Sequence, residues 1–397
     1  MPTTDRLPGA IRVLVVASFV VALGYGIVAP ALPVFATGFG VGVAAASLVV
    51  SAFAVCRLVF APVSGRLVGR IGELRVFCAG LAIVAASSAA CAFAATYWQL
   101  LVLRSLGGIG STMFTVSAAA LLVRLSPPHL RGRAVGAWAT GFLLGTIAGP
   151  LLGGALIGQS LRLPFLAYAV LLVVAAALSA VALRGRADGG PTPGRPAATF
   201  PAAFGHRTFR AALTANFVHG WTVYGVWVAL VPLYVVDVLA RPAAWSGAVL
   251  AVTAGGTAAA LVVGARMADA CGRRLPVLLG LGICAAGTLL PGLPASLPLF
   301  VLASLLVGVG NGLLDAPMNA AVADVVSDVR GSSGTALAGF QMVGDVGAVV
   351  GPVVAGLVAD ATGFGTAFAL TALIAVAAFV HWLGAPETAP RRLRAQT

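Results

Sequence analysis

Long runs of apolar residues alternate with short polar segments along the whole chain. A helix that crosses a bilayer needs about 20 mostly apolar residues, and twelve runs meet this requirement. The pattern therefore predicts an all-α membrane protein with twelve transmembrane helices. The predicted spans are residues 12–35, 44–63, 76–95, 98–121, 134–158, 163–183, 211–236, 245–264, 275–293, 298–321, 335–358 and 364–383.

The twelve spans are predicted to form two related six-helix bundles. A polar segment rich in Pro and Gly at 184–210 has the composition of a cytoplasmic linker, and it separates residues 1–183 from residues 211–397. Short motifs recur in the two parts at an almost constant offset, which indicates an internal duplication. The recurring pairs are Gly65-Arg66-Leu67 with Ala265-Arg266-Met267, Gly108-Ile109-Gly110 with Gly308-Val309-Gly310, and Gly149-Pro150 with Gly351-Pro352.

The composition excludes several classes of protein. Apolar residues make up 60% of the 397 residues and charged residues only 9%, whereas soluble domains carry about 25% charged residues. This excludes a soluble enzyme, and neither a nucleophile–base pair nor a phosphate-binding G-x4-GK[ST] motif indicates a membrane-embedded one. The number of cysteines is odd, and the chain has no CxxC and no His/Cys cluster. Neither a metal site nor a cofactor is therefore predicted.

The distribution of arginine predicts the orientation of the chain. All 24 basic residues are Arg, and the net charge is +13. With both termini in the cytoplasm, 20 arginines fall in inner loops and tails, two in outer loops and two within spans. The positive-inside rule thus predicts a multi-pass protein of the cell membrane with cytoplasmic termini. The partner that this charge indicates is the lipid bilayer, not nucleic acid.

The loop after the second span resembles the first loop motif of the major facilitator superfamily, G-x-L-a-D-r-x-G-r-k. A second, better copy follows the eighth span. The matching residues are Gly65, Arg70 and Gly72 in the first copy and Asp269, Gly272, Arg273 and Arg274 in the second. The first copy departs from the family at Gly69 and Glu73, where an Asp and a basic residue are expected. The resemblance implies that these loops gate the cytoplasmic side.

Spans 4 and 5 resemble the drug:proton antiporter subgroup of the same superfamily. In span 4, Arg104 precedes a glycine cluster in a pattern that the family links to proton coupling. Span 5 matches every fixed position of the family's antiporter motif. These positions are Gly136, Gly145, Gly149, Pro150, Gly153 and Gly154. Glycines four residues apart also allow a neighbouring helix to approach closely, so tight packing is a second role for the same residues.

Four ionisable residues within the spans are candidates for function, because a charge in the bilayer core costs about 2.5–3.5 kcal/mol on insertion scales. They are Arg57, Arg104, Asp315 and Asp345, and none has a charged equivalent in the other half. We predict that Asp315, Asp345 and Arg104 take part in proton coupling. Arg57 is expected to act in gating by pairing with Asp345 as the halves rock. The alternative for Arg104 is snorkelling to the outer interface.

In this family, spans 1, 4, 7 and 10 line a central cavity. Asn311, Asp315 and Asn319 recur every four residues in span 10 and are predicted to share one helix face; a packed polar network is the alternative. In span 7, a face running from Asn216 through Gly220 to Tyr224 and Trp227 suits a flat lipophilic substrate, unless it is ordinary aromatic packing. The predicted cavity residues are Tyr25, Asn216, His219, Tyr224, Trp227, Asn311, Asn319 and Gln341.

Together these patterns favour a secondary transporter that exports small amphipathic molecules in exchange for protons. Its partners would be the small-molecule substrate, protons and the bilayer. An importer or uniporter of a nutrient or metabolite is the alternative, because the acidic residue that some drug exporters carry in span 1 is absent from Gly24-Tyr25-Gly26. A membrane sensor that no longer transports is a third interpretation.

Overall fold

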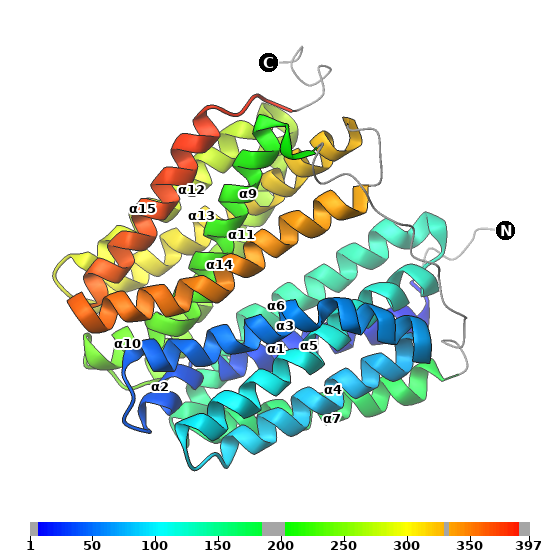
Figure 1. Cartoon of the computed structure of the whole chain (residues 1–397), viewed down its shortest axis with the longest axis horizontal. Coiled ribbons are helices and arrows are strands. Elements are labelled where there is room, and N and C mark those ends of the chain that lie inside the picture. The colour runs from blue at the N-terminus through cyan, green and yellow to red at the C-terminus, as the bar shows by residue number, and fades with distance from the viewer. Residues whose placement is uncertain (1–6, 185–202, 329–332, 389–397) are drawn as a thin grey trace. The chain divides into compact units, whose positions relative to one another are not determined.

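The computed structural model describes residues 7–184, 203–328 and 333–388. Within these residues, twelve helices are long and apolar enough to cross a membrane, which confirms the predicted number of spans. The chain divides into two compact units, drawn in Figure 1. Unit 1 comprises Met1–Phe39 and Ala52–Pro193, and unit 2 comprises Gly40–Ser51 and Gly194–Thr397. Most of the predicted linker lies outside the described residues.

Unit 1 is a bundle of long helices. They are α1 (Gly9–Val28), α2 (Leu32–Thr37), α3 (Val43–Ile71), α4 (Glu73–Ala92), α5 (Tyr97–Leu125), the short 3-10 turn η1 (Pro128–Leu130), α6 (Arg131–Ile157) and α7 (Leu163–Leu183). Helix α1 packs against α6 and α7, while α4 packs against α5 and α7. The start of α5 is capped by Thr96, whose hydroxyl accepts a hydrogen bond from the Gln99 amide.

Unit 2 repeats this arrangement with its own helices. They are α9 (Arg207–His219), the π-helical segment η2 (Gly220–Trp227), α10 (Val228–Asp237), α11 (Ala244–Cys271), α12 (Arg274–Leu289), the 3-10 turn η3 (Leu290–Gly292), α13 (Leu297–Asp328), α14 (Ser333–Thr362) and α15 (Phe364–Leu383). Helix α11 packs against α13, α12 against α13 and α15, and α14 against α9 and η2.

The packing of equivalent glycines supports the predicted duplication. A Cβ atom on Gly108 would lie 2.3 Å from the carbonyl oxygen of Phe53, and a Cβ on Gly308 would lie 2.2 Å from that of Thr253. Both glycines therefore let two helix backbones touch where any side chain would collide. The contact partners, like the glycines, are 200 residues apart, so each unit builds the same helix crossing from the same local sequence.

The first predicted span, 12–35, is not one continuous helix. Helix α1 ends at Val28, residues 29–31 form a turn, and α2 begins at Leu32. The cause is local, because Pro30 has no amide hydrogen to continue the ladder and Pro33 occupies the first turn of α2, where proline is tolerated.

The seventh span also departs from a regular α-helix. After α9 ends at His219, the chain forms eight residues of π-helix before α10 resumes the α-helical ladder. Here the backbone is closely packed: a Cβ on Gly220 would lie 1.9 Å from the carbonyl oxygen of Gly344 in α14. Because a π-turn contains an extra residue, the side chains after it are rotated away from the positions that α-helical spacing predicts.

The N-terminus of α3 belongs to unit 2, whereas the rest of that helix belongs to unit 1. The backbone amides of Val43 and Ala44 donate to the two carboxylate oxygens of Asp360 in α14, each at 2.9 Å. The carboxylate therefore satisfies two of the unpaired N–H groups at a helix start and suits the positive end of the helix dipole.

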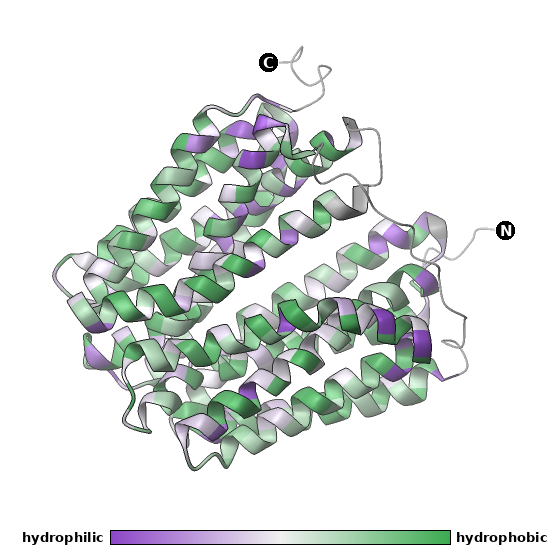
Figure 2. Ribbon diagram, in the orientation of Figure 1, coloured by the Kyte–Doolittle hydropathy of each residue, from purple (hydrophilic) through white to green (hydrophobic). Residues whose placement is uncertain are grey.

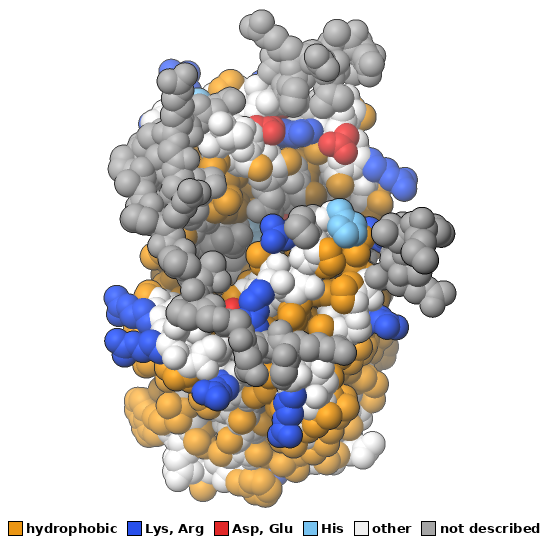
Figure 3. All heavy atoms as spheres, turned by 90° about the vertical axis from the view of Figure 1, so that its right-hand side faces the viewer, with side chains coloured by type: hydrophobic (Ala, Val, Ile, Leu, Met, Phe, Trp, Pro, Cys, Tyr) orange, Lys and Arg blue, Asp and Glu red, His pale blue; other side chains and the backbone are white. Residues whose placement is uncertain are grey.

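Hydropathy and charge follow the pattern of a membrane protein. Figure 2 shows hydrophobic residues along most of each helix and hydrophilic residues concentrated towards the helix ends. Figure 3 shows one face of the molecule, on which several arginine side chains gather. Among the described exposed arginines are Arg66, Arg70 and Arg75, which lie at or near the junction of α3 and α4.

Candidate functional site

Arg104 lies inside unit 1 and does not snorkel to the membrane interface. Only 3% of its surface is exposed. Its guanidinium carbon lies 4.3 Å from the centre of the Phe53 ring and 5.9 Å from the centre of the Tyr25 ring. Both distances are within the range of cation–π attraction. The helices α1, α3 and α5 thus bring together one cation and two aromatic rings that are far apart in the sequence.

Gly24 and Gly26 lie where α1 packs closely against its neighbours. A Cβ on Gly24 would lie 1.9 Å from the ring of Tyr168, and a Cβ on Gly26 would lie 2.9 Å from Pro150. Tyr168 is itself buried, with 2% of its surface exposed. The space that a side chain at position 24 or 26 would need is therefore already occupied by α6 and α7.

The antiporter motif forms a tight seam between α6 and α1. A Cβ on Gly145, Gly149 or Gly153 would lie 2.4–2.5 Å from a carbonyl oxygen of α1. These distances support a packing role for the three glycines. At Gly136, on the first two turns of α6, a Cβ would meet nothing within 4 Å.

The polar face predicted for span 10 separates into two groups. Asn319 is exposed and donates from its amide to the carboxylate and the backbone carbonyl of Asp315, at 3.0 and 2.8 Å. Asn311 is fully buried, and its amide oxygen lies 3.1 Å from Nδ1 of His219. Its amide nitrogen donates to the carbonyl of Val307. Asp315 therefore has one direct neighbour from the predicted set, while Asn311 belongs to a contact between α13 and α9.

The aromatic face predicted for span 7 is not formed. Trp227 is 1% exposed, packs against the rings of Phe300 and Phe368, and donates from Nε1 to the Thr253 hydroxyl at 3.0 Å. Tyr224 is 45% exposed. The π-helical segment η2 contains both residues, and its wider turns direct them to different surroundings. Trp227 is thus a core residue of unit 2, not a cavity residue.

The remaining predicted residues of unit 2 lie on α9 and α14. Asn216 is buried and donates from its side-chain amide to the carbonyl of Phe340 at 2.6 Å. This contact ties α9 to α14. Gln341 and Asp345 are both exposed and lie one helical turn apart on α14. The pairing of Arg57 with Asp345 stays a prediction.

The loop motif of unit 2 is an ion-pair cluster. Arg273 Nε lies 3.3 Å from Asp324, and its Nη1 lies 3.5 Å from Asp269. The backbone amides of Arg273 and Arg274 donate to the carboxylate of Glu387 at 2.9 and 3.0 Å. The cluster joins the ends of α11, α12 and α13 to the segment after α15.

Unit 1 has a counterpart of this cluster that the sequence analysis missed. Arg124 Nη1 lies 2.9 Å from a carboxylate oxygen of Glu73, and both side chains are largely buried. Glu73 and Arg124 are each 200 residues before Arg273 and Asp324, so the two units carry the same pair with opposite polarity. The glycines just before them, Gly72 and Gly272, share a φ of +89°, a conformation that favours glycine.

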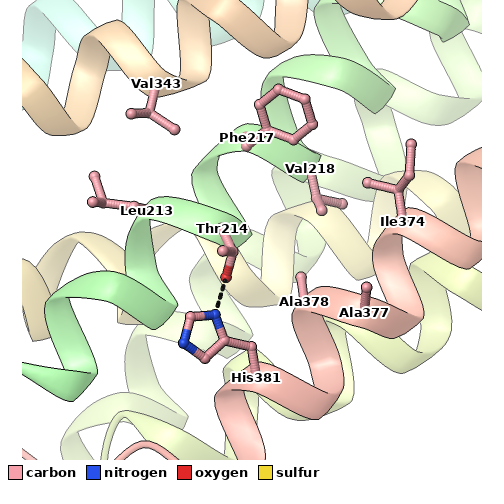
Figure 4. Close-up of a pocket in the computed structure, with 9 residues that line it drawn as sticks. All are labelled: Leu213, Thr214, Phe217, Val218, Val343, Ile374, Ala377, Ala378 and His381. Carbon is pink, nitrogen blue, oxygen red and sulfur yellow. Dashed lines mark hydrogen bonds between the residues drawn. The ribbon is translucent and has the colours of Figure 1, made fainter.

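Unit 2 also has an open apolar groove of about 450 Å³, which Figure 4 shows between α9, α14 and α15. Its one polar contact joins the Thr214 hydroxyl to Nδ1 of His381 at 3.3 Å. None of the predicted site residues lines it. The complete lining is Leu213, Thr214, Phe217, Val218, Val343, Ile374, Ala377, Ala378 and His381.

No group of three or more His, Cys, Asp or Glu side chains that could hold a metal ion occurs in the described part of the chain. Two repeated bundles with charged residues in their spans are typical of secondary membrane transporters.

Comparison with known proteins gives the family. The sequence model of the Major Facilitator Superfamily matches residues 14–256 and 212–397, and the chain belongs to this superfamily. It is a multi-pass membrane protein of the type that this superfamily defines. Its relatives include the Quinolone resistance protein NorA of Staphylococcus aureus, with 30% identity over 163 residues. An uncharacterized MFS-type transporter of Mycobacterium tuberculosis is 31% identical over 148 residues.

These sequence matches are partial. The NorA match covers 41% of this chain and 42% of NorA, and the mycobacterial match covers 37% of this chain and 26% of the relative. Solved structures are similar over nearly the whole chain. A bacterial homolog of the human lysosomal transporter Spinster has a TM-score of 0.74 at 17% identity, with 94% of each chain covered. The human organic anion transporter MFSD10 has a TM-score of 0.64 at 19% identity, covering 95% of this chain and 100% of its own.

Proposed function

We propose that this transporter exports small amphipathic molecules in exchange for protons. The observation that carries the proposal is the α1–α6 seam, in which Gly145, Gly149 and Gly153 of the antiporter motif bring two helix backbones into contact. The name of the staphylococcal relative, a quinolone resistance protein, supports an exported drug-like substrate. The arginine distribution supports cytoplasmic termini.

Asp315 and Asp345 are the proposed proton carriers. Asp315 is partly buried, and the amide of Asn319 donates to its carboxylate at 3.0 Å. Protonation removes the negative charge and weakens this charge-assisted hydrogen bond. Proton binding is coupled to transport if the protein favours different conformations with Asp315 protonated and with Asp315 ionised. The proton, like any ligand, shifts the conformational equilibrium only by its difference in affinity for the two states.

An importer or uniporter of a nutrient or metabolite is the second candidate. The observation that favours it is the packed Gly24 and Gly26, which leave α1 without the acidic residue that some drug exporters place there. In that case the Asp315 carboxylate would bind the substrate, or a cation other than the proton.

Reconstituted protein tests both candidates. Proteoliposomes that contain wild-type protein are loaded with ethidium as a probe, and a pH gradient of either sign is imposed. We expect transport to follow the gradient in wild type and to lose this dependence in Asp315→Asn, while ethidium binding is retained. The control is Asp237→Asn, which removes an exposed carboxylate at the end of α10 that has no assigned role in coupling or gating. Ethidium transport by wild type that is indifferent to the gradient would overturn proton antiport.

A further inference from the structure

The interior of unit 1 carries positive charge without a matching negative one. Glu73 is the only carboxylate among the described residues of this unit, and it is paired with Arg124. Arg104 and Arg57 lie within the membrane spans of the same unit. Burying a charge without a counter-ion is strongly unfavourable, so an unpaired guanidinium in a bilayer needs a reason other than packing.

Packing does not require an arginine at position 104. The equivalent residue of unit 2 is Ser304, which is fully buried and donates its hydroxyl to the carbonyl of Phe300 at 2.8 Å. The helix crossing around it is nevertheless the same, as the equivalent contacts of Gly108 and Gly308 show. The fold is therefore built equally well with a small, self-satisfied side chain at this position.

Arg104 is held in a way that leaves hydrogen-bonding capacity unused. Its guanidinium stacks on the Phe53 ring at 4.3 Å, and its buried Nε makes no hydrogen bond within the described structure. A guanidinium fixed by an aromatic face keeps its planar N–H edge in a set orientation. Such an edge matches a carboxylate, which can accept two parallel hydrogen bonds.

Other groups near Arg104 suit the same kind of ligand. Tyr25 lies 5.9 Å from the guanidinium and is partly exposed, so its ring offers a stacking surface. Tyr168 lies within electrostatic range of both Arg104 and Arg57. Arg57 is one helical turn after Phe53 on α3, and its side chain is exposed. Arg57, Tyr25 and Tyr168 thus lie in the same part of unit 1 as Arg104.

We propose that Arg104 binds the carboxylate of an aromatic organic anion or zwitterion, and that Tyr25 and Phe53 hold the ligand's ring and the guanidinium. The proposal deepens the proposed function, because such an anion is taken to be one of the transported substrates. Within the class of amphipathic molecules it defines one group, those with an acidic group and an aromatic ring, whose binding depends on Arg104.

A matched pair of probes tests this directly. The full-length protein is placed in nanodiscs of zwitterionic lipid, and binding of pyrenebutyrate is compared with binding of its uncharged amide, with empty nanodiscs as the baseline. We expect wild type to bind the carboxylate about ten- to a hundred-fold more tightly, the range expected for hydrogen bonds to a charged group. Arg104→Gln should bind both probes equally, at the level of the amide. Arg104→Lys keeps the charge without the planar edge and should retain part of the preference.

The control variant is Arg66→Gln, which removes an exposed arginine outside the cluster and should keep the full preference for the carboxylate. The comparison of the two probes in wild type does not depend on any variant being folded. For each variant, a thermal melting curve checks that the protein is folded. The proposal is overturned by absent saturable pyrenebutyrate binding, by equal affinity for the two probes in wild type, or by a preference that survives in Arg104→Gln. Because binding is measured without a gradient, these results are independent of whether transport is proton-driven.

Discussion

The buried pair between Glu73 and Arg124 allows a quantitative test of the repeat. The two side chains lie 2.9 Å apart between the start of α4 and the end of α5, and the exposed fractions of Glu73 and Arg124 are 8% and 21%. We consider four proteins: wild type, Glu73→Ala, Arg124→Ala and the double variant. A fifth, Glu73→Arg with Arg124→Glu, gives the pair the polarity that the equivalent pair has in unit 2.

The expected magnitude follows from burial. Removing one partner of a buried ion pair costs about 3–5 kcal/mol, because the other charge is left uncompensated. The Glu73 oxygen in the pair accepts no aligned hydrogen bond, which makes the pair weaker than an ideal one. Arg124 also keeps some contact with other groups around it. We therefore expect each single variant to lose unfolding free energy near the lower end of this range, about 3 kcal/mol. Removing both partners leaves no buried charge. The double variant should therefore be no less stable than either single variant, which corresponds to a coupling free energy of at least about 3 kcal/mol.

The assay is unfolding of the purified protein in detergent, followed by tryptophan fluorescence. Arg75→Ala is the matched control, because Arg75 is exposed and near the same helix end; its effect should stay within about 0.5 kcal/mol. The reversed pair should recover most of the stability lost in the single variants. Additive losses in the double variant, or a reversed pair as unstable as the single variants, would refute the reasoning.

Three other outcomes are expected. Gly149→Leu should prevent stable packing of α6 on α1 and abolish folded protein in size-exclusion chromatography, whereas Gly136→Leu should be tolerated, because a Cβ there meets nothing within 4 Å. Trp227→Ala should lower the unfolding free energy by about 3–5 kcal/mol, and Tyr224→Ala, at an exposed position, by less than about 1 kcal/mol; similar losses would contradict the assigned orientations. Asp315→Asn should abolish the response of transport to a pH gradient but leave ethidium binding intact, and an unchanged response would exclude Asp315 as the proton carrier.

Much of the fold could be predicted from the sequence because the bilayer constrains it strongly. A spanning segment must be both long and apolar, so the twelve helices stand out from composition alone. The glycines that repeat every 200 residues correctly indicated equivalent helix crossings. Breaks within the helices were harder to predict. Pro30 lies inside an apolar run, and only the missing amide hydrogen of this proline indicates that α1 ends two residues before it.

The site was predicted less well, for reasons that particular residues make clear. Tyr224 and Trp227 were assigned to one face by α-helical spacing, which fails inside a π-helical segment. The burial of Arg104 against Phe53 depends on two helices far apart in the sequence. The Glu73–Arg124 pair, in contrast, could have been found, because comparing charges at an offset of 200 shows opposite signs at both positions. The sequence analysis treated Glu73 only as a departure from the loop motif.

The reversed polarity of this pair bears on how the gene can change. If recombination between the two halves replaced the start of α4 with that of α12 and left the end of α5 in place, Arg would face Arg; the converse exchange would place Glu against Asp. Either crossover leaves two like charges in contact. The halves can therefore exchange this region only as a unit that includes both partners, which would protect each copy from being overwritten by its sister through gene conversion.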